Sequence, residues 1–153
     1  MSFTAFERYR RSVDAESSAV TVEEQSSDYE SGRVQIASET WRLRTARITP
    51  TKPGAFVAVW TRAPDGGTQP FDVADGCAGL LVFVEEESRF GVFTFTRAHL
   101  EALRISRSPH SPGKRGFRVY PPWSANLNSQ ATRTQRAQAA AFVDLSDERF
   151  RSR

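Results

Sequence analysis

The sequence lacks the residues for a disulfide scaffold, a cysteine-rich zinc site or a membrane helix. Cys77 is the single cysteine of the 153 residues, so no disulfide can form within the chain. With His99 and His110 as the remaining soft ligands, Cys₄ and Cys₂His₂ zinc sites are excluded. The longest apolar run, residues 80–84, is far shorter than the ~20 residues of a membrane helix, and no secretory segment follows Met1. These absences predict a soluble, cytoplasmic, single-domain protein without a membrane partner.

Lysine is also scarce, because 19 of the 21 basic residues are arginine. Residues 1–30 hold three arginines against seven acidic residues, a net charge of −4, whereas the rest of the chain holds 18 basic against 11 acidic residues, a net charge of +7. The positive charge of the chain after residue 30 suits a polyanionic ligand, since each phosphate contact releases counterions. The alternative is that these arginines only solvate the surface.

Alternating apolar and polar residues predict strands through the middle of the chain. In residues 40–48, Trp41 and Leu43 share one face while Arg42 and Arg44 share the other, and the alternation falters after Thr45, which indicates a bulge or a change of surroundings. A continuous apolar run predicts a central strand buried on both faces. The strands expected are 33–36, 40–48, 56–60, 79–84, 89–95 and 117–120.

Helices are expected at 97–103, where Thr96 can cap the first turn, and from Asn128 or Ser129 to about Asp144. The polar N-terminal region predicts a short helix followed by a mobile arm. We therefore expect one α+β domain with a mostly antiparallel or mixed sheet of five to six strands, flanked by helices and including a C-terminal helix. The expected organisation is an acidic arm or short helix over 1–27, the α+β domain over 28–146 and a C-terminal tail over 147–153.

Several strings of residues are distinctive as a set. They are 47–54 (RITPTKPG) with Phe56, Val57 and Trp60, then 69–71 (QPF), 90–95 (FGVFTF), 113–123 (GKRGFRVYPPW), 127–131 (LNSQA) and 134–135 (TQ). Together they resemble the MepB family of small bacterial proteins, from about Glu24 to the C-terminal helix. The resemblance implies a relation to nuclease-like folds and to nucleic-acid binding.

Both lysines, Lys52 and Lys114, fall in loops that contain glycine and proline. An ammonium group beside an approachable glycine backbone can bind a phosphate as a point charge. The alternative for each is a solvated lysine in a turn. With an arginine at Arg47 near the first loop, the two loops are candidates for the walls of one basic groove.

Basic residues and aromatic residues lie close together from the second loop onward. Arg115 and Arg118 precede Tyr120 and Trp123. Rings can stack on unpaired bases while cations follow the phosphates, which is how single strands are bound. The alternative is that the two rings form a structural corner at the intervening Pro-Pro turn.

The C-terminal helix adds Gln130 and Arg133, which could contact bases and phosphates or form an ordinary polar face. We therefore expect DNA or RNA binding without catalysis, cofactor or metal, and the sequence indicates no oligomeric state. The candidate binding residues are Arg47, Lys52, Lys114, Arg115, Arg118, Tyr120, Trp123, Gln130 and Arg133.

The alternative is a hydrolase acting on a phosphate-bearing substrate, such as a metal-dependent nuclease with a degenerate active site, and only this alternative needs Mg²⁺. Such nucleases place an acidic residue two positions before a lysine, whereas here those positions are Pro50 and Pro112. The two lysine loops would have to converge with a carboxylate, either Asp72 or Glu39. No glycine-rich nucleotide fingerprint occurs in the sequence.

Overall fold

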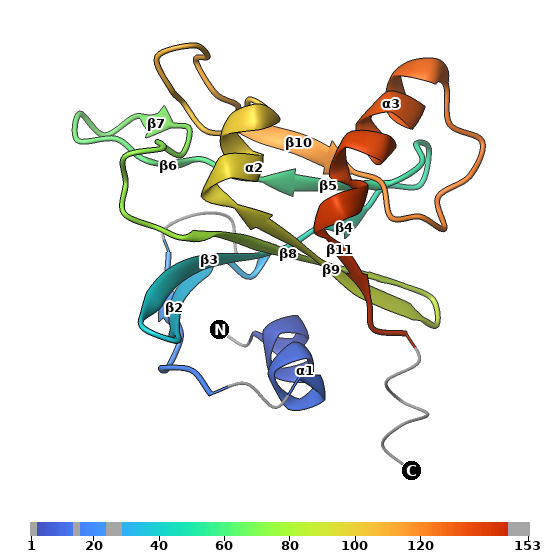
Figure 1. The fold of residues 1–153 in the computed structure, drawn as a ribbon, viewed down its shortest axis with the longest axis horizontal. Coiled ribbons are helices and arrows are strands. Elements are labelled where there is room, and N and C mark those ends of the chain that lie inside the picture. Colours follow the sequence, from blue (N-terminus) through green and yellow to red (C-terminus); the bar gives the residue numbers. More distant parts are fainter. Residues whose placement is uncertain (1–2, 14–15, 24–28, 147–153) are drawn as a thin grey trace.

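The computed structural model describes residues 3–13, 16–23 and 29–146. The fold contains a large mixed sheet, and a smaller sheet lies over one of its faces (Figure 1). In chain order the elements are α1 (Thr4–Ser12), β1 (Thr21–Val22), β2 (Gly32–Ile36), β3 (Glu39–Thr45), β4 (Arg47–Ile48), β5 (Ala55–Ala58), β6 (Thr61–Arg62), β7 (Thr68–Gln69), β8 (Gly79–Glu86), β9 (Arg89–Thr96), α2 (Arg97–Ala102), β10 (Gly116–Val119), α3 (Ser129–Gln138), the 3₁₀ turn η2 (Ala139–Ala141) and β11 (Phe142–Asp144).

The large sheet has six strands in the order β1-β2-β3-β8-β9-β11. Its neighbouring strands pair antiparallel except β3 and β8, which run parallel, so the expected mixed α+β sheet is confirmed. Residues 79–84 of β8 are all buried, as the apolar run predicts for a strand covered on both faces. Strand β8 is therefore a central strand, with β3 on one side and β9 on the other.

The smaller sheet has the order β10-β5-β4, and β6 and β7 form a separate hairpin. The main apolar cluster lies between the two sheets, and α2 and α3 lie beside the small sheet on the same side of the large one (Figure 1). On the opposite side α1 covers the large sheet, with the ring centroids of Phe6 and Phe83 6.3 Å apart. Buried members of the main cluster include Val57, Val119, Leu80, Val82, Phe93 and Phe95.

The faltering alternation after Thr45 marks the point where the chain changes sheets. Strand β3 ends at Thr45, the backbone N–H of Ala46 donates to the carbonyl of Phe83 over 2.9 Å, and β4 then pairs with β5. Residues on either side of Ala46 therefore face different neighbours. This change of surroundings explains why a single period of two does not fit residues 40–48.

The helix expected to reach Asp144 ends earlier, so that prediction is wrong for residues 139–144. After α3, one 3₁₀ turn leads into β11, which pairs antiparallel with β9 through Phe142↔Phe93 and Val143↔Val92. The ring centroids of Phe142 and Phe93 are 4.8 Å apart. Pairing with an open sheet edge and burying this ring outweigh the weak helix preference of the segment.

The expected N-terminal arm is partly a strand. Thr21 pairs with Arg33 and Val22 with Gly32, and the N–H of Glu23 donates to the carbonyl of Ser31 over 2.9 Å. The prediction of a short helix near the N-terminus matches α1, whereas the expected tail over 147–153 lies outside the described residues. Within the described part of the chain, no helix is long and apolar enough to cross a membrane.

Candidate anion-binding site

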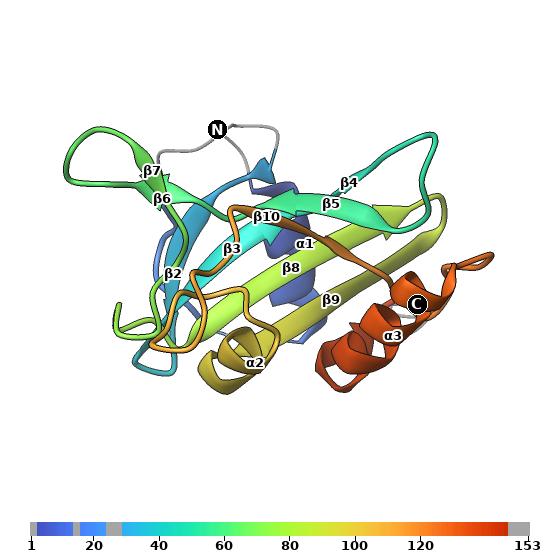
Figure 2. The ribbon, with the colours of Figure 1, turned by 90° about the horizontal axis from the view of Figure 1, so that it is seen from above.

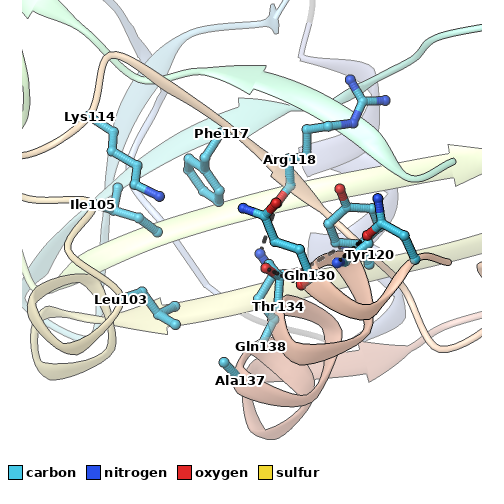
Figure 3. Close-up of a pocket in the computed structure, with 12 residues that line it drawn as sticks. Leu103, Ile105, Lys114, Phe117, Arg118, Tyr120, Gln130, Thr134, Ala137 and Gln138 are labelled. Carbon is cyan, nitrogen blue, oxygen red and sulfur yellow. Dashed lines mark hydrogen bonds between the residues drawn. The ribbon is translucent and has the colours of Figure 1, made fainter. Parts of the chain in front are cut away.

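A cavity of about 380 Å³ lies between β10 and α3 (Figure 3). We call it the β10–α3 cavity. None of the 12 residues that line it is acidic. Its polar side chains carry mainly amides and hydroxyls, together with one ammonium group. The lining residues are Leu103, Ile105, Lys114, Phe117, Arg118, Tyr120, Asn128, Gln130, Ala131, Thr134, Ala137 and Gln138.

Lys114 supplies the ammonium group of this cavity. Its backbone N–H donates to the carbonyl of Ile105 over 2.9 Å, which fixes the loop before β10. The side chain is exposed and extends beside Ile105 toward the other lining residues (Figure 3). It forms no hydrogen bond or ion pair with any residue in the described part of the chain. Its charge is therefore available to a ligand.

Gln138 joins α3 to the edge of β10. Its Nε2 donates to the carbonyl of Arg118 and its Oε1 accepts from the N–H of Tyr120, both over 2.9 Å. The side chain is only 2% exposed. Its amide thus pairs with the backbone at the end of β10 as a neighbouring strand would, and it links α3 to β10.

The other polar residues of α3 that face β10 follow helical spacing. Gln130, Thr134 and Gln138 lie four residues apart, so they share one face of the helix. This spacing is the sequence signal that could have identified Thr134 and Gln138 as cavity residues. Arg133, in contrast, is exposed on α3 and does not line the cavity.

The guanidinium group of Arg118 points away from the β10–α3 cavity (Figure 3). It donates to the carbonyl of Pro53, over 3.2 Å from Nη2, and to the hydroxyl of Thr49. Arg118 therefore ties the loop that contains Lys52 to β10. Its charge remains at the surface between this loop and the strand.

Lys52 belongs to a second cavity, of about 370 Å³, which we call the β4–β5 loop cavity. Residues 48–54 line it together with Glu86, Ala125 and Asn126. Since Gly116 pairs with Ala58 and Val119 with Ala55, Lys52 and Lys114 lie beyond opposite ends of the β5–β10 pair. The two lysines therefore do not form one groove, and each belongs to a cavity of its own.

Two further candidates are engaged in structural contacts. Arg115 donates through Nε to the hydroxyl of Thr68 over 3.0 Å and through Nη2 to its carbonyl over 2.9 Å. The indole N–H of Trp123 donates to Glu86 over 3.0 Å, and its ring lies edge-on to Phe142 with centroids 5.4 Å apart. These contacts favour the structural-corner alternative for Trp123 and fix Arg115 on the β6–β7 hairpin.

The carboxylates proposed for an enzyme line neither of the two cavities that contain a lysine. Asp72 is paired with Arg107 over 2.8 Å, and Glu39 is exposed at the start of β3. A hydrogen bond from the N–H of Ala74 and the guanidinium group of Arg107 lower the pKa of Asp72. Across residues 3–13, 16–23 and 29–146, no group of three or more His, Cys, Asp or Glu side chains could hold a metal ion.

Sequence reasoning missed the burial of two arginines of β3. Arg44 is 0% exposed and Arg42 9% exposed, and the guanidinium carbons lie 5.3 and 4.3 Å from the ring centroid of Phe71. Glu23 accepts from Arg42 over 3.1 Å and from Arg44 over 2.6 Å, and Asp75 also pairs with Arg42. These residues form a buried ion-pair network between β1, β3 and the loop before β8.

Comparison with known proteins agrees with the fold and the distinctive strings. A crystal structure described as that of MepB has a TM-score of 0.82 and 33% sequence identity, and the match covers 94% of this chain and 97% of that chain. No curated protein matches the chain. A model of the MepB-like family matches residues 23–144, which include both cavities and the buried network. The chain therefore belongs to the MepB-like family.

Proposed function

We propose that this protein binds nucleic acid through its phosphates, at the surface that includes both ends of β10. The observation that carries the proposal is the β10–α3 cavity, whose lining has an available ammonium group at Lys114 and no acidic residue. An anion entering it meets a positive charge without meeting a competing carboxylate. The amide of Gln130, exposed at the start of α3, adds hydrogen-bond donors at the same opening.

The spacing of the charges favours a polymer over a small anion. Strand β10 has four residues and spans roughly 13 Å, and the two lysines lie beyond its opposite ends. A single phosphate cannot contact both lysines, whereas a nucleic-acid strand carries a phosphate at every nucleotide. Arg118 lies between them, and Arg133 is exposed on the adjacent helix.

The proposal is for binding without catalysis. Cleavage of a phosphodiester by the metal-assisted route needs carboxylates that hold Mg²⁺ beside the scissile phosphate. Among the lining residues of the two cavities the carboxylate is Glu86, and it accepts a hydrogen bond from Trp123. The hydrolase alternative is therefore treated as an outcome of the binding experiment.

Fluorescence polarisation with labelled DNA and RNA oligomers, at salt concentrations between about 50 and 200 mM, tests the proposal. The variant is Lys114→Ala. The control is Arg11→Ala, which removes one exposed charge from α1 on the far side of the large sheet (Figure 1). We expect affinity to fall steeply with salt, and Lys114→Ala to reduce the slope of log affinity against log salt by about one.

Arg11→Ala is expected to leave affinity and slope unchanged. Equal effects of the two substitutions would mean that net charge, and not this surface, determines binding. Absence of binding at low salt, or binding that does not depend on salt, would refute the proposal. Running the oligomers on a gel after incubation with Mg²⁺ should show them intact, and cleavage would support the hydrolase alternative.

A further inference from the structure

Two aromatic side chains at the small sheet each lie over a glycine: Phe56 of β5 lies over Gly116 of β10, and Tyr120, just after β10, lies over Gly54, just before β5. A Cβ atom on Gly116 would lie 2.4 Å from Cζ of Phe56, and one on Gly54 would lie 2.6 Å from Cδ1 of Tyr120. Both distances are shorter than real Cβ contacts allow. Gly54 also has a φ of +78°, which favours glycine for a second reason. The two glycines thus leave room for the two rings to lie across the sheet.

These rings are on the outer face of the small sheet. Val57, on β5, and Val119, on β10, are fully buried between the sheets, so the alternate residues Phe56, Arg118 and Tyr120 point the other way. Both rings are partly exposed. In the view from above, β5 and β10 lie over the large sheet, and no described helix lies in front of them (Figure 2).

Positive charge borders the rings on this face. Arg118 pairs in register with Phe56, and its guanidinium group reaches the loop of Lys52 beside Tyr120. Arg47 pairs with Phe56 from the other side, so the ring of Phe56 lies between two arginines across the three strands. The face is partly exposed, and the ring of Tyr29 lies edge-on to Phe56 with centroids 6.4 Å apart. Rings bordered by cations on such a face match a single strand, in which bases alternate with phosphates along the chain.

We propose that the ligand is a single strand whose unpaired bases stack on Phe56 and Tyr120. This inference rests on the proposed function, because it names the ligand class that the same surface takes. In a duplex the bases are already stacked and paired, and their faces are not accessible to side chains. A single strand presents these faces, and stacking on them depends little on base identity.

The decisive comparison uses two labelled oligomers of about ten nucleotides, a length within the range that single-strand surfaces bind. One is oligothymidylate and the other is an abasic strand with the same phosphates and no bases. We expect the wild-type protein to bind oligothymidylate more tightly than either the abasic strand or a duplex of equal length. The dependence of affinity on salt should be similar for the two single strands, because their charges are the same.

Matched substitutions assign the effect to the rings. Phe56→Leu and Tyr120→Leu should each weaken binding of oligothymidylate roughly 5- to 150-fold. Neither should change binding of the abasic strand. Phe56→Tyr and Tyr120→Phe keep a ring at each position and should retain binding of oligothymidylate. Circular dichroism melts of every variant identify any that fails to fold, and the comparison of the two oligomers on the wild-type protein does not depend on a variant.

The outcomes separate this inference from the proposed function. Salt-dependent binding of equal strength to both oligomers, or tightest binding to the duplex, would overturn the stacking proposal and leave phosphate binding intact. Absence of salt-dependent binding to either oligomer would overturn both. Loss of binding in Phe56→Tyr as large as that in Phe56→Leu would also contradict a stacking role.

Discussion

The molecule uses positive charge in two opposite ways. On β3, Arg42 and Arg44 are buried and bound to carboxylates, and their guanidinium groups lie on the ring of Phe71. At the β10–α3 cavity, Lys114 is exposed among neighbours that carry no negative charge. The buried arginines hold elements together, whereas the exposed lysine is available to a ligand. The difference lies in the surrounding carboxylates and not in the cation.

The pKa values of the buried arginines reflect this environment. Burial lowers the pKa of Arg44, which the carboxylate of Glu23 only partly offsets. For Arg42, burial acts in the same direction, but Glu23 and Asp75 outweigh it and the pKa is raised. Both guanidinium groups remain charged at neutral pH. Charged groups at this depth depend on their counter-ions, so Glu23 is the point at which the network is most sensitive.

The largest effect is expected from Glu23→Gln, which removes the shared counter-ion of Arg42 and Arg44. Breaking a buried ion pair leaves an uncompensated charge and costs about 3–5 kcal/mol. Urea denaturation would measure the change in the free energy of unfolding. The control Glu39→Gln removes an exposed carboxylate at the start of β3 and should change stability by less than about 0.5 kcal/mol. Equal values for the two variants would show that the network contributes nothing to stability.

A smaller loss of stability is expected from Gln138→Leu. This change removes the side-chain partners of the carbonyl of Arg118 and of the N–H of Tyr120, two partly buried groups, and should cost about 1–3 kcal/mol in total. Gln130→Leu makes the same chemical change on an exposed residue of the same helix and should leave the urea midpoint unchanged. If Gln138→Leu is as stable as the wild type, the amide does not act as a substitute strand.

The smallest effect is expected from the exposed pair of Asp72 and Arg107, which contrasts with the buried pairs. The pKa of Asp72 lies below its ordinary value of 3.8, so its carboxylate stabilises the fold above that pH. This contribution is lost as the pH falls through the lowered pKa. A carboxyl titration by NMR should show the lowered pKa and its return toward 3.8 in Arg107→Gln. An unchanged value in that variant would leave the hydrogen bond from Ala74 as the cause.

Hydrophobic patterns along the chain predicted most of the longer strands, because such a pattern depends only on residues that are close in sequence. Residues 89–95 are rich in phenylalanine and valine and follow the preceding strand after a short turn, and they form β9 as expected. Thr96 caps α2 through the N–H of His99, as a hydroxyl residue at that position predicts. The wrong helix end shows the limit of this approach, since β11 forms only where the edge of β9 is present to pair with it.

The candidate site was predicted less completely than the fold. Lys114, Arg118, Tyr120 and Gln130 do line one cavity, but Lys52 belongs to another. Spacing along the chain could not show this, because the two lysines are separated by the length of a strand pair whose register is a tertiary property. The structural contacts of Arg115 and Trp123 likewise involve partners more than 30 positions away in the sequence.

The sequence by itself determined most of the longer strands, that residues 79–84 are buried on both faces, and that the chain resembles the MepB family. Strand alternation also assigned Arg42 and Arg44 to one face of β3. Only the tertiary structure decided that this face is buried, because a period of two defines two faces without saying what covers either. The layers that surround β3, and the carboxylate of Glu23, which reaches β3 from the residue after β1, are set by contacts between distant parts of the chain.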